Sequence, residues 1–323
     1  MMLNGFSFTS GLKAFVRLIR LPNVMMIILT QALLRYCIIM PYLYPEAPDS
    51  ISPLTDFLIL VIVTVLIAIG GYVINDYFDV KIDSINRPEK LVVSKLISGF
   101  AAIKLHILLN SVAILLGIYL AWRIKTFSFG IVFPFISGLL WIYSAKYKRV
   151  LFWGNFIVAG LSAFVILVVL LFEFFWLRLN AVQFVNVLPD IRWVTYVCLG
   201  YAAFAFLVTM VREIIKDMED TEGDEATGCQ TIPIVLGTKY SRYIVGMLLI
   251  FTMLLLGYTQ LILFRVSMLT PFWYFMVIQS GTIYILYKLY YAREKQDFHY
   301  LSSLCKLIMV AGILSMELIL ISN

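Results

Sequence analysis

Asn and Asp side chains recur at helical spacing in the segment NDYFDVKID, in a chain with few acidic residues elsewhere. Asn75, Asp79 and Asp83 are four residues apart, so a helix would stack them along one side, about 6 Å apart. Asp76 points about a quarter turn away from that line. Oxygen ligands at this spacing suit a hydrated magnesium ion shared with a phosphate, because Mg²⁺ takes only one or two carboxylates from a protein.

A second acidic segment, REIIKDMEDTEGD, follows a related pattern. Asp217, Asp220 and Asp224 lie at i, i+3 and i+7, with Glu213 one turn earlier on the same face. We expect Gly223 to loosen or end this helix. So many acids in one segment repel each other, so either some of them stay protonated or divalent cations neutralise them.

The composition of the chain is that of a membrane protein. Hydrophobic residues make up 62% of the sequence, charged residues 14%, and the mean hydropathy is +0.94, which indicates a polytopic protein. About 20 apolar residues cross a bilayer core of roughly 30 Å, and spans of this composition must be helices because they lack the alternation of a membrane barrel. We therefore predict an all-α fold with nine transmembrane helices. The predicted spans are 18–40, 54–75, 100–122, 127–144, 151–177, 193–212, 243–264, 268–290 and 304–321.

Alternate loops carry most of the 25 Lys and Arg residues. The positive-inside rule then predicts a cytoplasmic N-terminus, an external C-terminus and cytoplasmic positions for both acidic segments. The net charge of +6 follows from these loops and requires no nucleic-acid partner. We predict an integral, multi-pass protein of a bacterial or archaeal cell membrane, surrounded by membrane lipids, whose oligomeric state the sequence leaves open.

Basic residues alternate with the acidic ones, and together they suit diphosphate binding. Arg87 follows the first acidic segment, and Arg212 and Lys216 belong to the second. Lys148 and Arg149 follow the fourth predicted span, where the positive-inside rule alone would also place them. Both interpretations stay open for this last pair.

Some ionisable residues, among them Arg35 and Glu173, fall inside predicted spans but outside the acidic segments. We expect Arg35 to snorkel outward from the first span rather than to bind substrate. We expect Glu173 to lie at the membrane interface. The four cysteines have no paired spacing, and we take them as structural.

The segment NDYFDVKIDSINRP resembles the first aspartate motif of the UbiA superfamily of intramembrane prenyltransferases, and KDMEDTEGD resembles the second. The resemblance extends to nine spans, motifs after the second and sixth of them, a basic signature from Tyr143 to Arg149 and the tripeptide LPN at 21–23 entering the first span. It covers the whole chain, taken as a single domain of residues 1–323.

The resemblance implies a helical bundle around a central cavity, Mg²⁺ as cofactor and an isoprenyl diphosphate held between the two motifs. The implied magnesium ligands are Asn75, Asp79, Asp83, Asp217, Asp220 and Asp224, and the five aspartates among them are the implied catalytic residues. The substrate-binding candidates, including the basic residues above, are Asn23, Arg87, Tyr143, Lys148, Arg149, Arg212 and Lys216.

The implied reaction transfers a prenyl group from an isoprenyl diphosphate donor to a lipophilic acceptor. Diphosphate departs, the allylic carbon gains cationic character, and water must be excluded. The residues of the second motif are most similar to those of family members that use geranylgeranylglyceryl phosphate. The loop EKLVVSKLISG, in contrast, departs from the Pro-Ser-Gly turn that is usual in the family. An aromatic acceptor of the 4-hydroxybenzoate type remains the alternative. A membrane transporter explains the acids less well, because carriers place key charges near the midplane.

Overall fold

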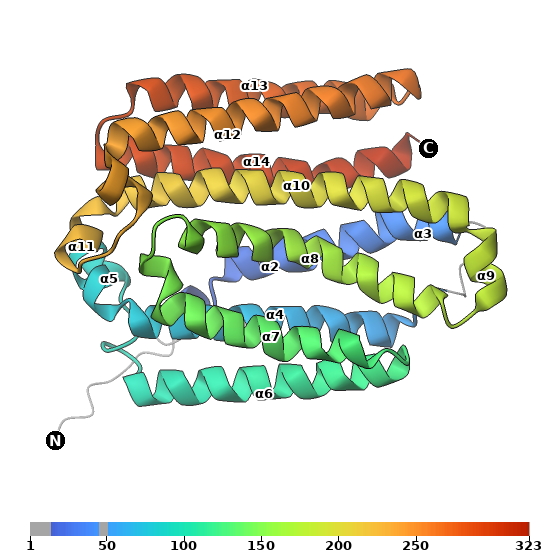
Figure 1. Cartoon of the computed structure of the whole chain (residues 1–323), viewed down its shortest axis with the longest axis horizontal. Helices are drawn as coiled ribbons and strands as arrows, with labels where there is room; N and C mark the ends of the chain where they lie inside the picture. The colour runs from blue at the N-terminus through green and yellow to red at the C-terminus, as the bar shows by residue number, and fades with distance from the viewer. Residues whose placement is uncertain (1–13, 45–50, 323) are drawn as a thin grey trace. The chain divides into compact units, whose positions relative to one another are not determined.

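The computed structural model describes residues 14–44 and 51–322, and these are almost entirely helical (Figure 1). No β-strand occurs among these residues; an isolated bridge joins Val93 and Ile97. Within the same ranges, nine helices are long and apolar enough to cross a membrane. The prediction of an all-α, multi-pass membrane protein is therefore confirmed. The nine helices are Leu21–Leu43, Leu54–Phe78, Gly99–Arg123, Phe127–Ala145, Trp153–Leu177, Leu188–Glu219, Ile232–Arg265, Leu269–Tyr291 and Lys295–Ile321.

Several helices extend beyond the predicted spans into polar sequence. The helix α10 (Leu188–Glu219) runs past the predicted span 193–212 and carries the start of the second acidic segment. The helix α14 (Lys295–Ile321) begins well before its predicted start, because Glu294 and Asp297 form a capping box at its N-terminus. Hydropathy detects the apolar part of such helices, whereas capping and helix propensity set their ends.

The chain divides into two compact units, of which the first comprises residues 1–28 and 54–147 as far as they are described. Three long helices of this unit contact one another. The first of them leads into the first acidic segment. The elements of this unit are α4 (Leu54–Phe78), α5 (Val80–Asn86), the 3₁₀ turn η3 (Pro88–Lys90), α6 (Gly99–Arg123) and α7 (Phe127–Ala145).

Glycines allow these helices to approach closely. A Cβ on Gly70 would lie 2.4 Å from the Nδ2 atom of Asn110, and one on Gly117 would lie 2.2 Å from the ring of Phe133. His106 bonds the Gly70 carbonyl across 2.8 Å, and its Nδ1 atom must be the donor because a carbonyl only accepts. The helix α4 is thus held firmly against α6, a little more than one turn before Asn75.

A small hydrophobic cluster fixes the segments around the end of α4. Leu18 packs with Val73, Ala102, Val92 and Val93. The cluster joins the N-terminal segment and the loop after η3 to α4 and α6. Apolar burial therefore positions both flanks of the first acidic segment.

The second unit comprises residues 29–53 and 148–323, again as far as they are described. The helix α10 contacts α8, α12 and α14, and α13 contacts α12 and α14. Two further elements cross the division between the units, namely α2 (Leu21–Leu33) and the 3₁₀ turn η4 (Tyr147–Arg149). The elements of the second unit are the π-helix η1 (Leu34–Ile39), α3 (Met40–Leu43), α8 (Trp153–Leu177), α9 (Ala181–Asn186), α10, α11 (Thr221–Ala226), α12 (Ile232–Arg265), α13 (Leu269–Tyr291) and α14.

Arg35 and Glu173 form a buried ion pair in the second unit. The Arg35 Nη1 and Glu173 Oε1 atoms are 2.8 Å apart, and the two side chains are 3% and 0% exposed. Ser52 donates its hydroxyl to the same Glu173 oxygen across 2.6 Å and also accepts from Arg35. The expectation that Arg35 snorkels outward is wrong, because pairing and hydrogen bonding offset the cost of burying both charges. Glu173 lies one turn before the end of α8, and its place near the membrane interface stays a prediction.

Candidate active site

Asp79 marks the junction between α4 and α5. Its φ and ψ of −90° and −1° interrupt the helix only slightly. The backbone N–H of Asp79 donates to the Asn75 carbonyl across 2.9 Å, and that of Asp83 donates to the Asp79 carbonyl across 2.8 Å. Helical hydrogen bonding therefore continues through the motif, and the predicted helical stacking of Asn75, Asp79 and Asp83 is confirmed.

Asn75 and Asp79 form a buried pair of possible oxygen ligands. The Asn75 Nδ2 atom donates to the Asp79 Oδ2 atom across 2.6 Å, and the two residues are 8% and 2% exposed. The Asn75 Oδ1 atom has no hydrogen-bond partner among the described residues. A buried oxygen without a donor is destabilising, and a bound cation would satisfy it, so this pair fits a magnesium site.

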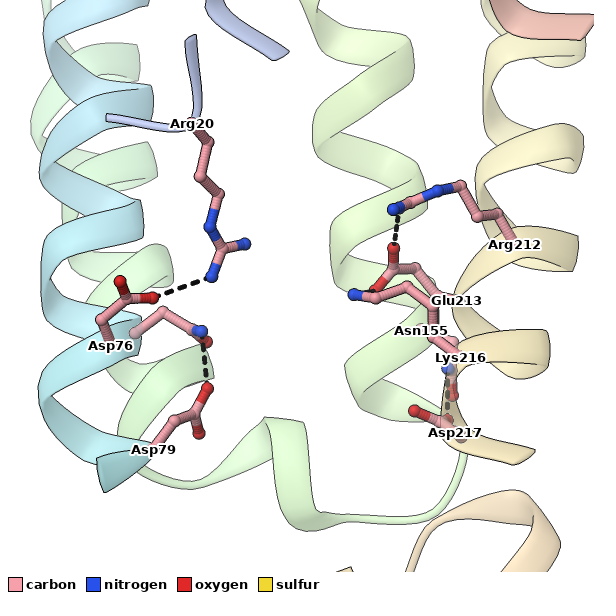
Figure 2. Close-up of polar contacts among 9 residues, drawn as sticks. Arg20, Asp76, Asp79, Asn155, Arg212, Glu213, Lys216 and Asp217 are labelled. Carbon is pink, nitrogen blue, oxygen red and sulfur yellow. Dashed lines mark hydrogen bonds and ion pairs between the residues drawn. The ribbon is translucent and has the colours of Figure 1, made fainter. Parts of the chain in front are cut away.

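Asp76 belongs to the same motif but binds Arg20. The Arg20 Nη2 and Asp76 Oδ1 atoms are 2.9 Å apart (Figure 2), and the guanidinium lies 4.9 Å from the centre of the Tyr72 ring. Burial lowers the pKa of Arg20, but Asp76, Tyr72 and Asp79 together raise it by more, so Arg20 stays charged. Sequence reasoning missed this contact, since nothing in the pattern links residues 56 positions apart.

The second motif is built in the same way as the first. Asp220 marks the junction between α10 and α11, with φ and ψ of −100° and 10°. The backbone N–H of Asp220 donates to the Lys216 carbonyl across 2.9 Å, and the N–H of Asp224 donates to the Asp220 carbonyl across 3.2 Å. The expectation that Gly223 would loosen or end the helix is wrong, because Gly223 lies inside α11 and the interruption falls at Asp220.

The two motifs share one spacing that sequence reasoning did not notice. In each, the junction aspartate has one aspartate three residues before it and another four residues after it. The two sets are Asp76, Asp79 and Asp83, and Asp217, Asp220 and Asp224. Nearly equal backbone angles at the two junctions show that the repeat is structural as well as sequential.

The first aspartate of the second motif is also held by another segment. The Asn155 Nδ2 atom, near the start of α8, donates to Asp217 Oδ2 across 2.7 Å (Figure 2). Asn155 was missed by sequence reasoning, although a buried amide next to a basic loop is a polar exception within an apolar span. Asp76 and Asp217 thus correspond in position and each has a fixed partner.

Arg212 and Lys216, both predicted to bind substrate, lie on either side of Glu213. Arg212 Nη1 is 2.6 Å from Glu213 Oε1, and Lys216 Nζ is 3.3 Å from Oε2 (Figure 2). Arg212 and Lys216 thus carry their positive charges near the end of α10, which leads into Asp220. These charges suit a phosphate anion.

Lys148 and Arg149 lie beside the second motif. The Gln230 N–H donates to the Arg149 carbonyl across 2.9 Å, and the neighbouring Cys229 N–H donates to the Asp224 carbonyl across 2.9 Å. Burial raises the pKa of the Cys229 thiol, Asp224 raises it further, and Arg149 and Lys148 oppose this shift. The structure therefore brings both basic residues into the neighbourhood of Asp224.

The remaining candidates lie in the first unit. Asn23 is half-buried in the first turn of α2, Arg87 ends α5, and Tyr143 is half-buried on α7. No three His, Cys, Asp or Glu side chains in the described part of the chain converge to hold a metal ion. The first motif offers one amide and one carboxylate side by side, and the roles assigned to all the site residues stay predictions.

Known proteins resemble this chain over much of its length. Digeranylgeranylglyceryl phosphate synthase of Thermococcus kodakarensis is 32% identical over 207 residues, which are 64% of this chain and 66% of the relative. The chain spans 58 to 66% of the length of four relatives with that name.

Solved structures share the fold. A structure concerned with digeranylgeranylglyceryl phosphate synthase in membranes matches with a TM-score of 0.65 at 23% identity, covering 97% of this chain and 99% of that one. A UbiA homologue from Archaeoglobus fulgidus bound to GPP and Mg²⁺ matches with a TM-score of 0.53 at 15% identity, covering 94% and 99%. The profile of the UbiA prenyltransferase family matches residues 38–302, and the chain therefore belongs to that family.

Proposed function

We propose that this protein transfers a prenyl group from an isoprenyl diphosphate to geranylgeranylglyceryl phosphate within the membrane, with Mg²⁺ as cofactor. The repeated aspartate motif, with a carboxylate at the same helix junction in each copy, carries the proposal. The names of the sequence relatives support this acceptor, and the A. fulgidus homologue bound to GPP and Mg²⁺ supports the donor and the cofactor.

The proposed magnesium ligands come from both motifs. Mg²⁺, when bound, neutralises charge on the diphosphate and makes it a better leaving group. Asn75 supports this role through its buried amide oxygen, which has no hydrogen-bond donor among the described residues. The proposed ligands are Asn75, Asp79, Asp220 and Asp224, with Asp83 and Asp217 in support.

Basic side chains would bind the phosphate oxygens. Arg212 and Lys216 are pre-positioned by Glu213, and Lys148 and Arg149 are positioned by the segment after α11. Arg87 would act in the same way beside the first motif. These residues stabilise the charge that develops on the departing diphosphate, while the apolar helices exclude water from the allylic cation.

We further propose that the two motifs act on one diphosphate donor. The acceptor hydroxyl then attacks the allylic carbon as the carbon–oxygen bond to diphosphate breaks, and its proton leaves for solvent or a nearby base.

An assay with defined acceptors tests the proposal. Purified protein with Mg²⁺ and labelled geranylgeranyl diphosphate should form product with geranylgeranylglyceryl phosphate, and a chelator should abolish it. Product with 4-hydroxybenzoate alone would indicate that the enzyme uses an aromatic acceptor. Donor accumulation in sealed vesicles without product would instead indicate a carrier. Failure of magnesium-dependent donor binding would overturn the prenyltransferase proposal.

We propose that the N-terminus and both motifs face the cytoplasm, in keeping with the positive-inside rule. All four native cysteines are buried, so single introduced thiols can report topology. In intact cells, a membrane-impermeant maleimide should label Thr270→Cys, at the exposed start of α13, but not Ser84→Cys on the exposed side of α5. Lysis should make both reactive, and the reverse pattern in intact cells would contradict the proposed orientation.

A further inference from the structure

Two arginine side chains converge at the C-terminus of α13. Arg242 from α12 donates Nη1 to the carbonyls of Tyr290 and Ala292 across 3.4 and 3.2 Å. Arg293 donates its own Nη1 to the same two carbonyls across 3.0 and 2.8 Å. Because both donors reach one oxygen, the two Nη1 atoms lie within about 6 Å of each other.

Neither guanidinium of this pair forms an ion pair with a carboxylate in the described part of the chain, although two acids lie nearby. The nearby acids Glu294 and Asp297 are engaged in the capping box of α14, where Asp297 accepts from the backbone N–H groups of Arg293 and Glu294. Hydrogen bonding does not remove the negative charge of these two carboxylates, so they offset part of the charge of the arginine pair. The partial negative charge of the helix C-terminus also attracts the two cations.

The surroundings of the pair are typical of a membrane interface. Exposed tyrosines gather on the same ends of α12, α13 and α14, and Lys288 lies 5.7 Å from the centre of one of their rings. Tyrosine is enriched where the bilayer meets water, because its ring is apolar and its hydroxyl is polar. The exposed tyrosines are Tyr240, Tyr243, Tyr284, Tyr287, Tyr290, Tyr291 and Tyr300.

The patch lies at the same end of the second unit as the second acidic motif. His299, one turn into α14, contacts Glu219 at the end of α10 across 2.9 Å, and α11 leads directly towards α12 (Figure 1). The patch therefore belongs to the membrane surface at which the second motif lies. It uses none of the residues assigned to the proposed reaction.

We infer that Arg242 and Arg293 bind the phosphate group of an anionic membrane lipid. Two guanidinium groups held close together present several N–H donors to one phosphate, and such charge-assisted bonds are strong. The tyrosine rings place the pair at headgroup depth, where a phospholipid is anchored and a soluble anion is not. The site is separate from the catalytic acids and does not depend on which acceptor the enzyme uses.

Native mass spectrometry of the purified protein in detergent tests the site. Phosphatidylglycerol should bind more tightly than phosphatidylcholine, and Arg242→Gln/Arg293→Gln should weaken phosphatidylglycerol binding by about tenfold. The matched control Arg178→Gln/Arg265→Gln removes the same charge from two exposed arginines elsewhere in this unit. It should leave that binding within about twofold.

A charge-conserving variant separates recognition from general attraction. Arg242→Lys/Arg293→Lys keeps both charges at the end of α13 but loses the planar forks, so it should still weaken phosphatidylglycerol binding by about threefold or more. If the double glutamine variant fails to fold, the double lysine variant still tests whether the two arginines bind the lipid phosphate. Unchanged binding in either variant, equal loss in the control pair, or displacement of the lipid by millimolar inorganic phosphate would overturn the inference.

Discussion

Replacing Asp79 with asparagine is expected to lower the rate of prenyl transfer by about a thousandfold. The substitution keeps the size of the side chain and the helix junction but removes the buried charge next to the Asn75 amide oxygen. Turnover should be measured with labelled donor at saturating Mg²⁺. Asp190→Asn, which changes an exposed acid in the first turn of α10, is the matched control and should retain full activity.

Asp220→Asn should cause a loss of similar size, and the double variant tests whether the motifs act together. If both aspartates serve one donor, magnesium-dependent binding of the diphosphate should fall in each single variant and fall little further in the double variant. Losses that multiply would show two independent sites and would contradict the proposal that both motifs act on one donor.

Breaking the buried ion pair is expected to have the largest effect on stability. Arg35→Leu or Glu173→Gln should each destabilise the protein by about 3 to 5 kcal/mol, because a charged or polar partner is left buried without its counterpart. Titration with denaturant in mixed micelles would measure the change in the free energy of unfolding. Arg178→Gln, an exposed arginine at the end of α8, should change the free energy of unfolding by less than about 0.5 kcal/mol.

Removing both charges together should be less harmful than removing one. Arg35→Met/Glu173→Leu replaces the pair with apolar side chains of similar length, and such replacements are often neutral or stabilising. The double variant should therefore recover most of the lost stability. A double variant as unstable as the singles would show that the fold needs the hydrogen bonds to Ser52 rather than charge balance.

The fold was largely predictable because the bilayer imposes a length and a composition on each span. Leu54–Phe78 and Leu269–Tyr291 lie within a few residues of their predicted limits. The ends of α10 and α14 were not predictable from hydropathy, since polar residues continue the helix there. Gly223 failed as a helix breaker because the backbone hydrogen bonds around it are kept and an isolated glycine costs only about 1 kcal/mol.

Local spacing predicted the acidic residues of the candidate site, whereas their partners depend on tertiary structure. The contact of Asn75 with Asp79 follows from helix geometry. The contacts of Arg20 with Asp76 and of Asn155 with Asp217 span 56 and 62 positions. A single sequence carries no signal for such distances.

The matched junctions at Asp79 and Asp220 limit how the two motifs can change in length. One inserted residue in an α-helix rotates everything beyond it by about 100° and moves it by about 1.5 Å. Such an insertion between Asp79 and Asp83 would turn the last carboxylate away from the face that holds Asp79. The apolar residues between the aspartates can be exchanged for others, but the count of residues between the carboxylates cannot drift without redirecting one of them.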